Sequence, residues 1–227
     1  MIDTAFDFYS DTPLGKDPDA LSPTLRRYHQ ILWSKPLPNG EKLDLSTNGR
    51  KYLTWKDFVF GSDAITNSYR HRKKMASLIA DVMHEADELF QAGSTIGAYT
   101  IFPSAQIDRK NTINQARGVI ATIDDRFDLT LECIRRHYSR ECSPLSEVLS
   151  RYGKFFDLFY DFRGYVDFFL LQDLVDDAYE VKFFLPFDNF ERRGAPSNPE
   201  EYRALKEATL AFIQSRAERI QTSLPKN

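Results

Sequence analysis

The sequence predicts an α+β protein: a small, mostly antiparallel sheet with an N-terminal hairpin, packed by several helices. Stretches with strand-like patterns cluster in the first half of the chain, whereas helical periodicity dominates the second half. The dipeptide Asn48-Gly49 lies between two alternating stretches, which is a strong hairpin signal. Strands and helices do not alternate steadily, and the sequence has no G-x-G-x-x-G or P-loop motif. A Rossmann-type sheet is therefore disfavoured.

Length and composition are those of one globular domain. The chain has 227 residues, so we expect residues 1–227 to form a single domain. Of these residues, 42% are hydrophobic and 14% are aromatic, which predicts a core rich in packed rings. The formal net charge is −3, whereas proteins that coat nucleic acid are basic. Any contact with nucleic acid must therefore come from a local basic patch.

The sequence predicts a cytoplasmic location. The N-terminus lacks the basic start and apolar run of a signal peptide, and no apolar stretch is long enough to span a membrane. We therefore expect no membrane contact. The two cysteines, Cys133 and Cys142, are predicted to remain free thiols in a reducing compartment.

Residues 1–23 are rich in Asp, Pro, Ser and Gly and are predicted to form an irregular arm. Ser22 followed by Pro23 combines an N-cap residue with proline at the first helical position, which predicts a helix over residues 23–33. Four apolar residues of the arm indicate that it packs on the body of the protein: Phe6, Phe8, Tyr9 and Leu14.

The hairpin is predicted from alternation on both sides of Asn48-Gly49. Leu43 and Leu45 alternate with polar residues before the turn, and Tyr52 and Thr54 do so after it. The Asn-Gly pair tolerates the positive φ angles of a two-residue type I′ turn. We therefore expect residues 43–45 and 52–54 to pair.

A third strand, a long helix and an internal strand follow. Residues 57–63 predict a short strand, and apolar residues spaced by three and four predict a helix from Asn67 to Gln91 that stops at Gly93. The β-branched and aromatic stretch 95–103, closed by Pro103, predicts the clearest internal strand.

The rest of the chain is predicted to be mostly helical. Residues 179–186 are expected to form one more strand, and residues 191–199 a loop. The last helix is expected to begin near Ser197-Asn198-Pro199 and to run to about Thr222. The remaining helices are predicted over residues 113–122, 125–138, 144–152, 154–160 and 165–175.

The first candidate site is an anion site that follows the internal strand. Asn114 and Arg117 are three residues apart, so they share a helix face, and they follow a polar loop that begins at Ser104. Arg126 opens the next helix. The planar guanidinium of arginine suits phosphate or carboxylate. We therefore predict an anion site formed by Ser104, Asn114, Arg117 and Arg126.

The second candidate site is a basic and aromatic cluster. The stretch from Asn67 to Met75 places Tyr69, Arg70, His71 and Arg72 in direct succession. Cations interleaved with an aromatic ring are what contact with a phosphate backbone requires. The alternative is a solvated first turn of a helix, in which Asp63 compensates for cations that oppose the helix dipole.

The charges of residues 125–138 also have an ordinary explanation. Glu132 precedes Arg135 and Arg136 by three and four residues, which is the spacing of ion pairs on a helix. As exposed pairs they would contribute under about 1 kcal/mol each. Arg117 and Arg126 are predicted to differ in role from Arg135 and Arg136; the alternative is that Asp124 and Asp125 balance the charge of Arg126, in which case the set is only structural.

Two further patterns are weak. Asp81 and His84 share a helix face, but the sequence offers no matching ligands for zinc. Glu180-x-Lys182 resembles the acidic–x–lysine element of metal-dependent nucleases, yet the preceding region is predicted to be helical. We therefore predict no metal site, and no pattern indicates a cofactor.

Four stretches resemble an uncharacterised bacterial family, a domain of unknown function of about this length. The resemblance covers most of the chain and implies a bacterial, cytoplasmic, single-domain protein. It implies no activity and no catalytic residues. The stretches are FDFYSDTPLGKDPDALSPTLRRYHQILWSKPLPNG, RFDLTLECIRRHY, FRGYVDFFLLQDLV and KFFLPFDNF.

Two functions follow as expectations. The first is binding of, or action on, a phosphate-bearing ligand, with a nucleotide or nucleic acid as partner, through the two basic sets. The second is a non-catalytic protein-interaction module, in which the N-terminal arm and aromatic surface contact a protein partner. Whether the protein is an enzyme, and on what substrate, is left open by the residues.

Overall fold

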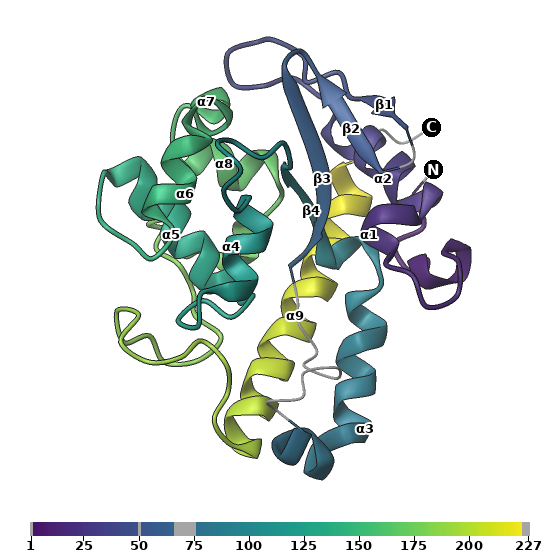
Figure 1. Ribbon diagram of the computed structural model, residues 1–227. Coiled ribbons are helices and arrows are strands. Elements are labelled where there is room, and N and C mark those ends of the chain that lie inside the picture. Colours follow the sequence, from purple (N-terminus) through teal and green to yellow (C-terminus); the bar gives the residue numbers. More distant parts are fainter. Residues whose placement is uncertain (1, 50, 66–75, 224–227) are drawn as a thin grey trace.

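A four-stranded antiparallel sheet with helices on both sides forms the protein, and the predicted α+β class is confirmed (Figure 1). The computed structural model describes residues 2–49, 51–65 and 76–223. The strands follow one another in the order β1-β2-β3-β4. Their bounds are Ser46–Asn48 for β1, Tyr52–Trp55 for β2, Phe58–Ala64 for β3 and Tyr99–Pro103 for β4.

The hairpin is present, but its first strand begins later than predicted. Asn48 pairs with Tyr52, so Asn48 ends β1 and does not form a two-residue turn, while Gly49 has a φ of +64°. Leu43 and Leu45 do not pair with β2. Their backbone N–H groups donate to Lys35 O and to Ser34 Oγ, at 3.0 Å in both cases. These bonds hold the segment against the end of the first long helix.

The helices group on the two sides of the sheet. Figure 1 shows α4 to α8 on one side and α1, α2 and α9 on the other. The first group has the bounds Ile113–Val119 (α4), Phe127–Ser139 (α5), Ser146–Arg151 (α6), Gly153–Phe156 (α7) and Phe162–Phe168 (α8). The second comprises Pro18–Leu21 (α1), Pro23–Trp33 (α2) and Pro199–Ser223 (α9), with α3 at Ala76–Gly93.

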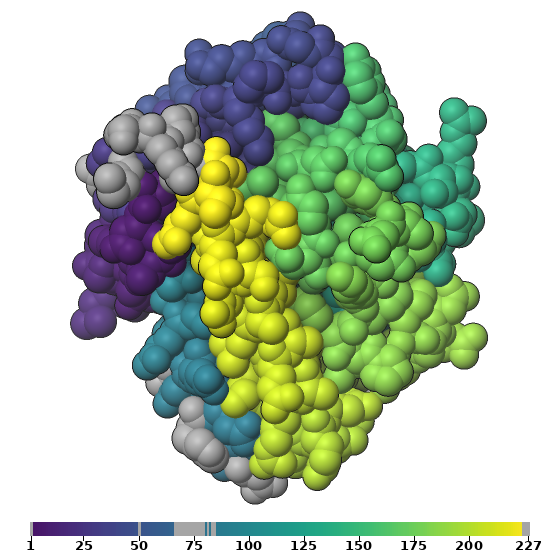
Figure 2. All heavy atoms as spheres, turned by 180° about the vertical axis from the view of Figure 1, so that it is seen from behind, coloured from purple at the N-terminus to yellow at the C-terminus, as the bar shows by residue number. Residues whose placement is uncertain are grey.

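Helix α9 lies across the back of the molecule, between α3 and the segments around α8 (Figure 2). Gly97, which precedes β4, permits this close packing, because a Cβ there would lie 2.5 Å from Ile213 O of α9. Arg216 of α9 is fully buried and donates to the carbonyls of Gly97, Tyr99 and Phe169. Helix α9 is thereby fixed to β4.

The N-terminal arm packs on the body largely as predicted. Asp7 caps a short 3-10 helix over Phe8–Asp11, and Phe8 is fully buried against Tyr28 and Tyr99. Leu14 was also expected to pack, but it is fully exposed. The Ser22 cap is confirmed, since its hydroxyl accepts the Leu25 N–H at 3.0 Å.

Several predicted elements are shorter than expected. Residues 179–186 form no strand, because their pairing is limited to a single bridge between Val175 and Val181. Helix α4 ends at Val119 because Ile120 is extended, and Asp124 and Asp125 adopt positive φ angles before α5 begins. The predicted helix 154–160 divides into α7 and a 3-10 turn that stops at Tyr160, whose φ is +66°.

The core is aromatic, and both cysteines are free thiols as predicted. Rings of α7, α8 and the turn between them pack edge to face or tilted around Phe159, with Tyr165 and Phe169 at 5.4 and 5.3 Å. Cys133 is buried and Cys142 is exposed. Within the described ranges, no helix has the length and apolar character needed to cross a membrane.

Candidate functional site

A polar pocket of about 570 Å³ lies between the sheet and the start of α4. Ser104 and Asn114, two residues of the predicted anion site, both line it. The loop 104–112 carries the chain from the end of β4 across to α4, which brings the two together. The remaining lining residues are Lys51, Tyr52, Gly61, Ser62, Phe102, Pro103, Gln106, Thr112 and Gln115.

Local sequence explains the shape of this pocket. Thr112 and Gln115 form a reciprocal capping box, which fixes the first turn of α4 and with it Asn114. Gly61 of β3 pairs with Phe102 of β4, and a Cβ at Gly61 would lie only 3.2 Å from Ser104 Cβ. A larger residue at Gly61 would therefore push into the pocket wall.

The pocket is suited to a negatively charged ligand. None of its described lining residues carries a carboxylate, and Lys51 supplies a cation. The Lys51 ammonium lies 5.2 Å from the centroid of the Tyr52 ring, so a charge and an aromatic face are neighbours. The other side chains offer hydroxyl and amide groups, which can donate to phosphate or carboxylate oxygens.

Arg117 lies beneath this surface, paired with Asp63. Asp63 is two residues beyond Gly61 on β3, so it shares the face of the sheet on which Gly61 opens the pocket. Arg117 is fully buried and donates from NH1 to Asp63, from Nε to Thr130 Oγ1 at 2.9 Å, and from NH2 to Asp125 O at 3.0 Å. All three nitrogens of its guanidinium group thus bind protein groups.

Burial dominates the electrostatics of the Asp63–Arg117 pair. It raises the pKa of Asp63 to about 6, against the lowering effect of Arg117 and with a further raising effect from Asp125. Thr100, directly opposite Asp63 on β4, is fully buried, and its hydroxyl has no hydrogen-bond partner among the described residues. The pair therefore connects the sheet to α4 in a polar region of the interior.

Arg126 lies apart from the pocket. Its guanidinium donates to both oxygens of Asp128 and to Gly194 O, and Asp128 also accepts the Phe184 N–H at 2.9 Å. Arg126 and Asp128 are both buried. The predicted four-residue set thus divides: Ser104 and Asn114 line the pocket, Arg117 supports it, and Arg126 ties α5 to residues 184–194. The predicted residues Tyr69, Arg70, His71 and Arg72 lie outside the described residues and stay a prediction.

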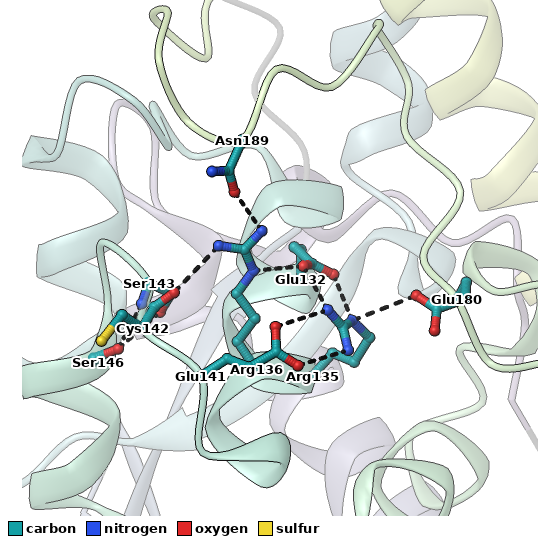
Figure 3. Close-up of polar contacts among 9 residues, drawn as sticks. All are labelled: Glu132, Arg135, Arg136, Glu141, Cys142, Ser143, Ser146, Glu180 and Asn189. Atoms are coloured by element: carbon teal, nitrogen blue, oxygen red, sulfur yellow. Dashed lines mark hydrogen bonds and ion pairs between the residues drawn. The ribbon is translucent and has the colours of Figure 1, made fainter.

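Arg135 and Arg136 both pair with Glu132 as predicted, but not as exposed pairs (Figure 3). The Glu132 side chain is 4% exposed and the two arginines are 18% and 15% exposed. Arg136 also donates to Asn189 Oδ1 at 2.6 Å and to Cys142 O at 3.2 Å. The expectation of exposed ion pairs is therefore wrong, because α5 is covered by the chain around residue 189.

A second polar network connects α2 to Ser62 of β3, a residue that also lines the pocket, and no sequence pattern indicated it. The His29 ring is 1% exposed, accepts the Trp33 indole N–H at Nδ1, and bonds Ser62 Oγ through Nε2. Ser62 Oγ in turn donates to Asp19 Oδ1 at 3.3 Å. Burial, followed by the charge of Arg216, lowers the pKa of His29 to about 3. His29 is therefore neutral, with its proton on Nε2.

Asp19, which is partly buried, completes this network. Burial raises its pKa, and the carboxylates of Asp17 and Asp63 raise it further. Among the residues that the structure describes, no group of three or more His, Cys, Asp or Glu is arranged to hold a metal ion. The Asp81 and His84 side chains lie outside that set, while Glu180 lies 3.7 Å from Arg135.

Comparison with known proteins places the chain in a family. No curated protein matches it, and no solved structure does. A family model described as a family of unknown function, DUF6994, matches residues 2–220, which is nearly the whole chain. The protein therefore belongs to the DUF6994 family.

Proposed function

We propose that this protein binds a phosphate-bearing ligand of nucleotide size in the pocket between the sheet and α4. The observation that carries the proposal is the lining: hydrogen-bonding side chains and one lysine, with no carboxylate among the described lining residues. A volume of about 570 Å³ is within the range of small-molecule sites. A carboxylate-free wall is unusual in a chain of net charge −3 and favours an anion.

The arrangement assigns a role to each part of the ligand. The Lys51 ammonium neutralises phosphate charge, and the adjacent Tyr52 ring offers a face on which a base can stack. Asn114 and Ser104 supply amide and hydroxyl groups across the pocket from the hairpin. Arg117 is a positioning residue in this proposal, because it fixes α4, and with it Asn114, against Asp63.

A protein-interaction module is supported less well. The large apolar side chains that are exposed lie on separate elements of the chain, and a docking surface for a protein needs a contiguous patch. In the part of the chain that the structure describes, they are Tyr9, Leu14, Ile31, Ile107, Val119 and Tyr160. A bacterial protein in the cytoplasm is part of the proposal, and the free thiols of Cys133 and Cys142 support the cytoplasmic location alone.

Binding of nucleotides to the wild type and to Lys51→Gln tests the proposal. We expect calorimetry to detect binding of a nucleoside triphosphate by the wild type, and about tenfold weaker binding by the variant through loss of a charge-assisted contact. The corresponding nucleoside, which has no phosphate, should show little difference between the two proteins. Lys16→Gln, which removes an exposed cation outside the described pockets, is the control. No heat of binding with any nucleotide would refute the proposal.

A further inference from the structure

The loop 104–112 borders two cavities besides the candidate pocket. Its Ala105 and Ile107 line a second cavity of about 630 Å³ beside α7, and its Arg109 and Lys110 line a third of about 370 Å³ between α4 and α6. Pro103 is shared by the candidate pocket and the second cavity. Arg151 is shared by the second and the third. The three cavities therefore form one continuous surface around the loop.

This surface is basic although the whole chain is acidic. Among the residues that the structure describes, six cations and three carboxylates line the three cavities, which gives a formal charge of +3, whereas the chain carries −3. The surface around the loop stays positive, at +2, when Asp108, the exposed carboxylate of the loop itself, is counted with the lining residues. The cations are Lys51, Lys56, Arg109, Lys110, Arg151 and Lys154, and the carboxylates are Asp57, Glu147 and Asp157.

The third cavity is short of negative charge. Glu147 forms ion pairs with both Lys110 and Arg151, with N···O distances of 2.8 and 3.2 Å, and its side chain is 76% exposed. Arg151 also donates to Asn111 O at 2.7 Å, which holds its guanidinium at the cavity wall. Its Nε–H is buried and has no hydrogen-bond partner among the described residues. An anion in this cavity would supply the missing charge.

The two larger cavities offer aromatic faces. Tyr52 lines the candidate pocket and Phe58 lines the second cavity, and both rings are partly exposed, whereas Tyr152 of the second cavity is buried. Phe58 stacks on Trp55 with an angle of 11° between the rings, so its position is fixed. Bases of a single strand stack on such rings, whereas the paired bases of a duplex cannot enter cavities on either side of a loop.

We propose that the extended ligand of this surface is a single-stranded nucleic acid that crosses the loop 104–112. Its phosphates contact Arg109, Lys110 and Arg151, and its bases enter the two larger cavities. This inference rests on the proposed function, because it extends the nucleotide of the candidate pocket into a strand. It assigns Arg109 and Lys110 a role in binding the strand and none in binding a mononucleotide.

Fluorescence anisotropy with a labelled single strand of about 12 nucleotides tests the inference. Four phosphate contacts, with Lys51 in the candidate pocket and with Arg109, Lys110 and Arg151 around the loop, predict that log K falls with log salt at a slope of about −2.8, since single strands lose about 0.7 per contact. Replacing two of the cations, Arg109→Gln with Lys110→Gln, should reduce the slope to about −1.4 and weaken binding about tenfold or more at low salt. The same double variant should bind a mononucleotide as the wild type does.

The matched control removes two exposed cations outside the described cavities, Lys16→Gln with Lys182→Gln, and should keep the wild-type slope. A duplex of the same length should bind at least about tenfold more weakly than the strand. Strand binding no tighter than mononucleotide binding, or an equal loss in both double variants, would overturn the inference and leave the proposed function standing. If the wild type binds the strand but no mononucleotide, the proposed function is overturned instead.

Discussion

Removal of the Arg117 side chain is the most informative perturbation of the site's support. In Arg117→Met the Asp63 carboxyl, whose side chain is 7% exposed, loses its ion pair, and Thr130 Oγ1 and Asp125 O lose a donor. Breaking a buried pair from one side costs about 3–5 kcal/mol, because the remaining charge is left in the interior. We therefore expect the free energy of unfolding at pH 7.5 to fall by about that amount.

The cost should depend on pH in a defined direction. Burial already raises the pKa of Asp63 to about 6, and loss of Arg117 removes a lowering influence, so Asp63 in the variant takes up a proton more readily. The deficit should therefore shrink as the pH falls from 7.5 to 5. Urea denaturation followed by tryptophan fluorescence measures it.

Arg27→Met is the control, because Arg27 is an exposed arginine on α2, and it should change stability by less than about 0.5 kcal/mol. A cost for Arg117→Met below about 1 kcal/mol, or one that does not vary with pH, would refute the assignment of Arg117 as a buried partner of Asp63.

Three further outcomes are expected. The pKa of His29 is about 3 in the folded protein, against an ordinary 6.5, so the stability that its neutral ring contributes is present above pH 6.5 and falls by about 2 kcal/mol at pH 5. In urea titrations, the free energy of unfolding of His29→Gln should lack this loss at low pH. The same pH dependence in the variant and the wild type would contradict a buried neutral ring. Because burial raises the pKa of Cys133 to about 12 while Cys142 is exposed, iodoacetamide should add one group to the native protein and two to the unfolded protein by mass spectrometry; two additions to the native protein would contradict the burial. Arg136→Ala should lower the free energy of unfolding, measured by thermal denaturation, by about 1–3 kcal/mol, since it leaves the nearly buried Glu132 with fewer hydrogen-bond donors. A change near zero would indicate that the pair behaves as an exposed ion pair.

Local signals in the sequence predicted best the helix starts that are fixed by capping. Ser22-Pro23 predicted the start of α2 because capping involves only neighbouring residues. The hairpin was displaced because the backbone groups of Leu43 and Leu45 bond to Lys35 and Ser34 near the end of α2, a contact that alternation cannot reveal.

In the candidate site, too, residues close in the sequence were predicted correctly and contacts between distant residues were not. Ser104 and Asn114 were brought together correctly, since a short loop joins β4 to α4. The partner of Arg117 was not predicted, because Asp63 lies 54 residues earlier in the chain. Lys51 and Tyr52 of the hairpin were also not predicted as residues of the site. The start of α4 at Ile113 was predicted correctly, and the capping-box pattern of Thr112 and Gln115, which also marks it, was not used.

A comparison of two substitutions at Asn114 tests most directly whether the pocket binds an anion. Asn114→Asp keeps the shape of the side chain and suits the first turn of α4, but it places the first carboxylate among the described lining residues. Asn114→Ala removes the amide without adding charge. Calorimetry with a nucleoside triphosphate should show binding weakened about tenfold more by Asp than by Ala, whereas the uncharged nucleoside should bind both variants alike. Equal effects of the two substitutions on the triphosphate would contradict an anion in this pocket.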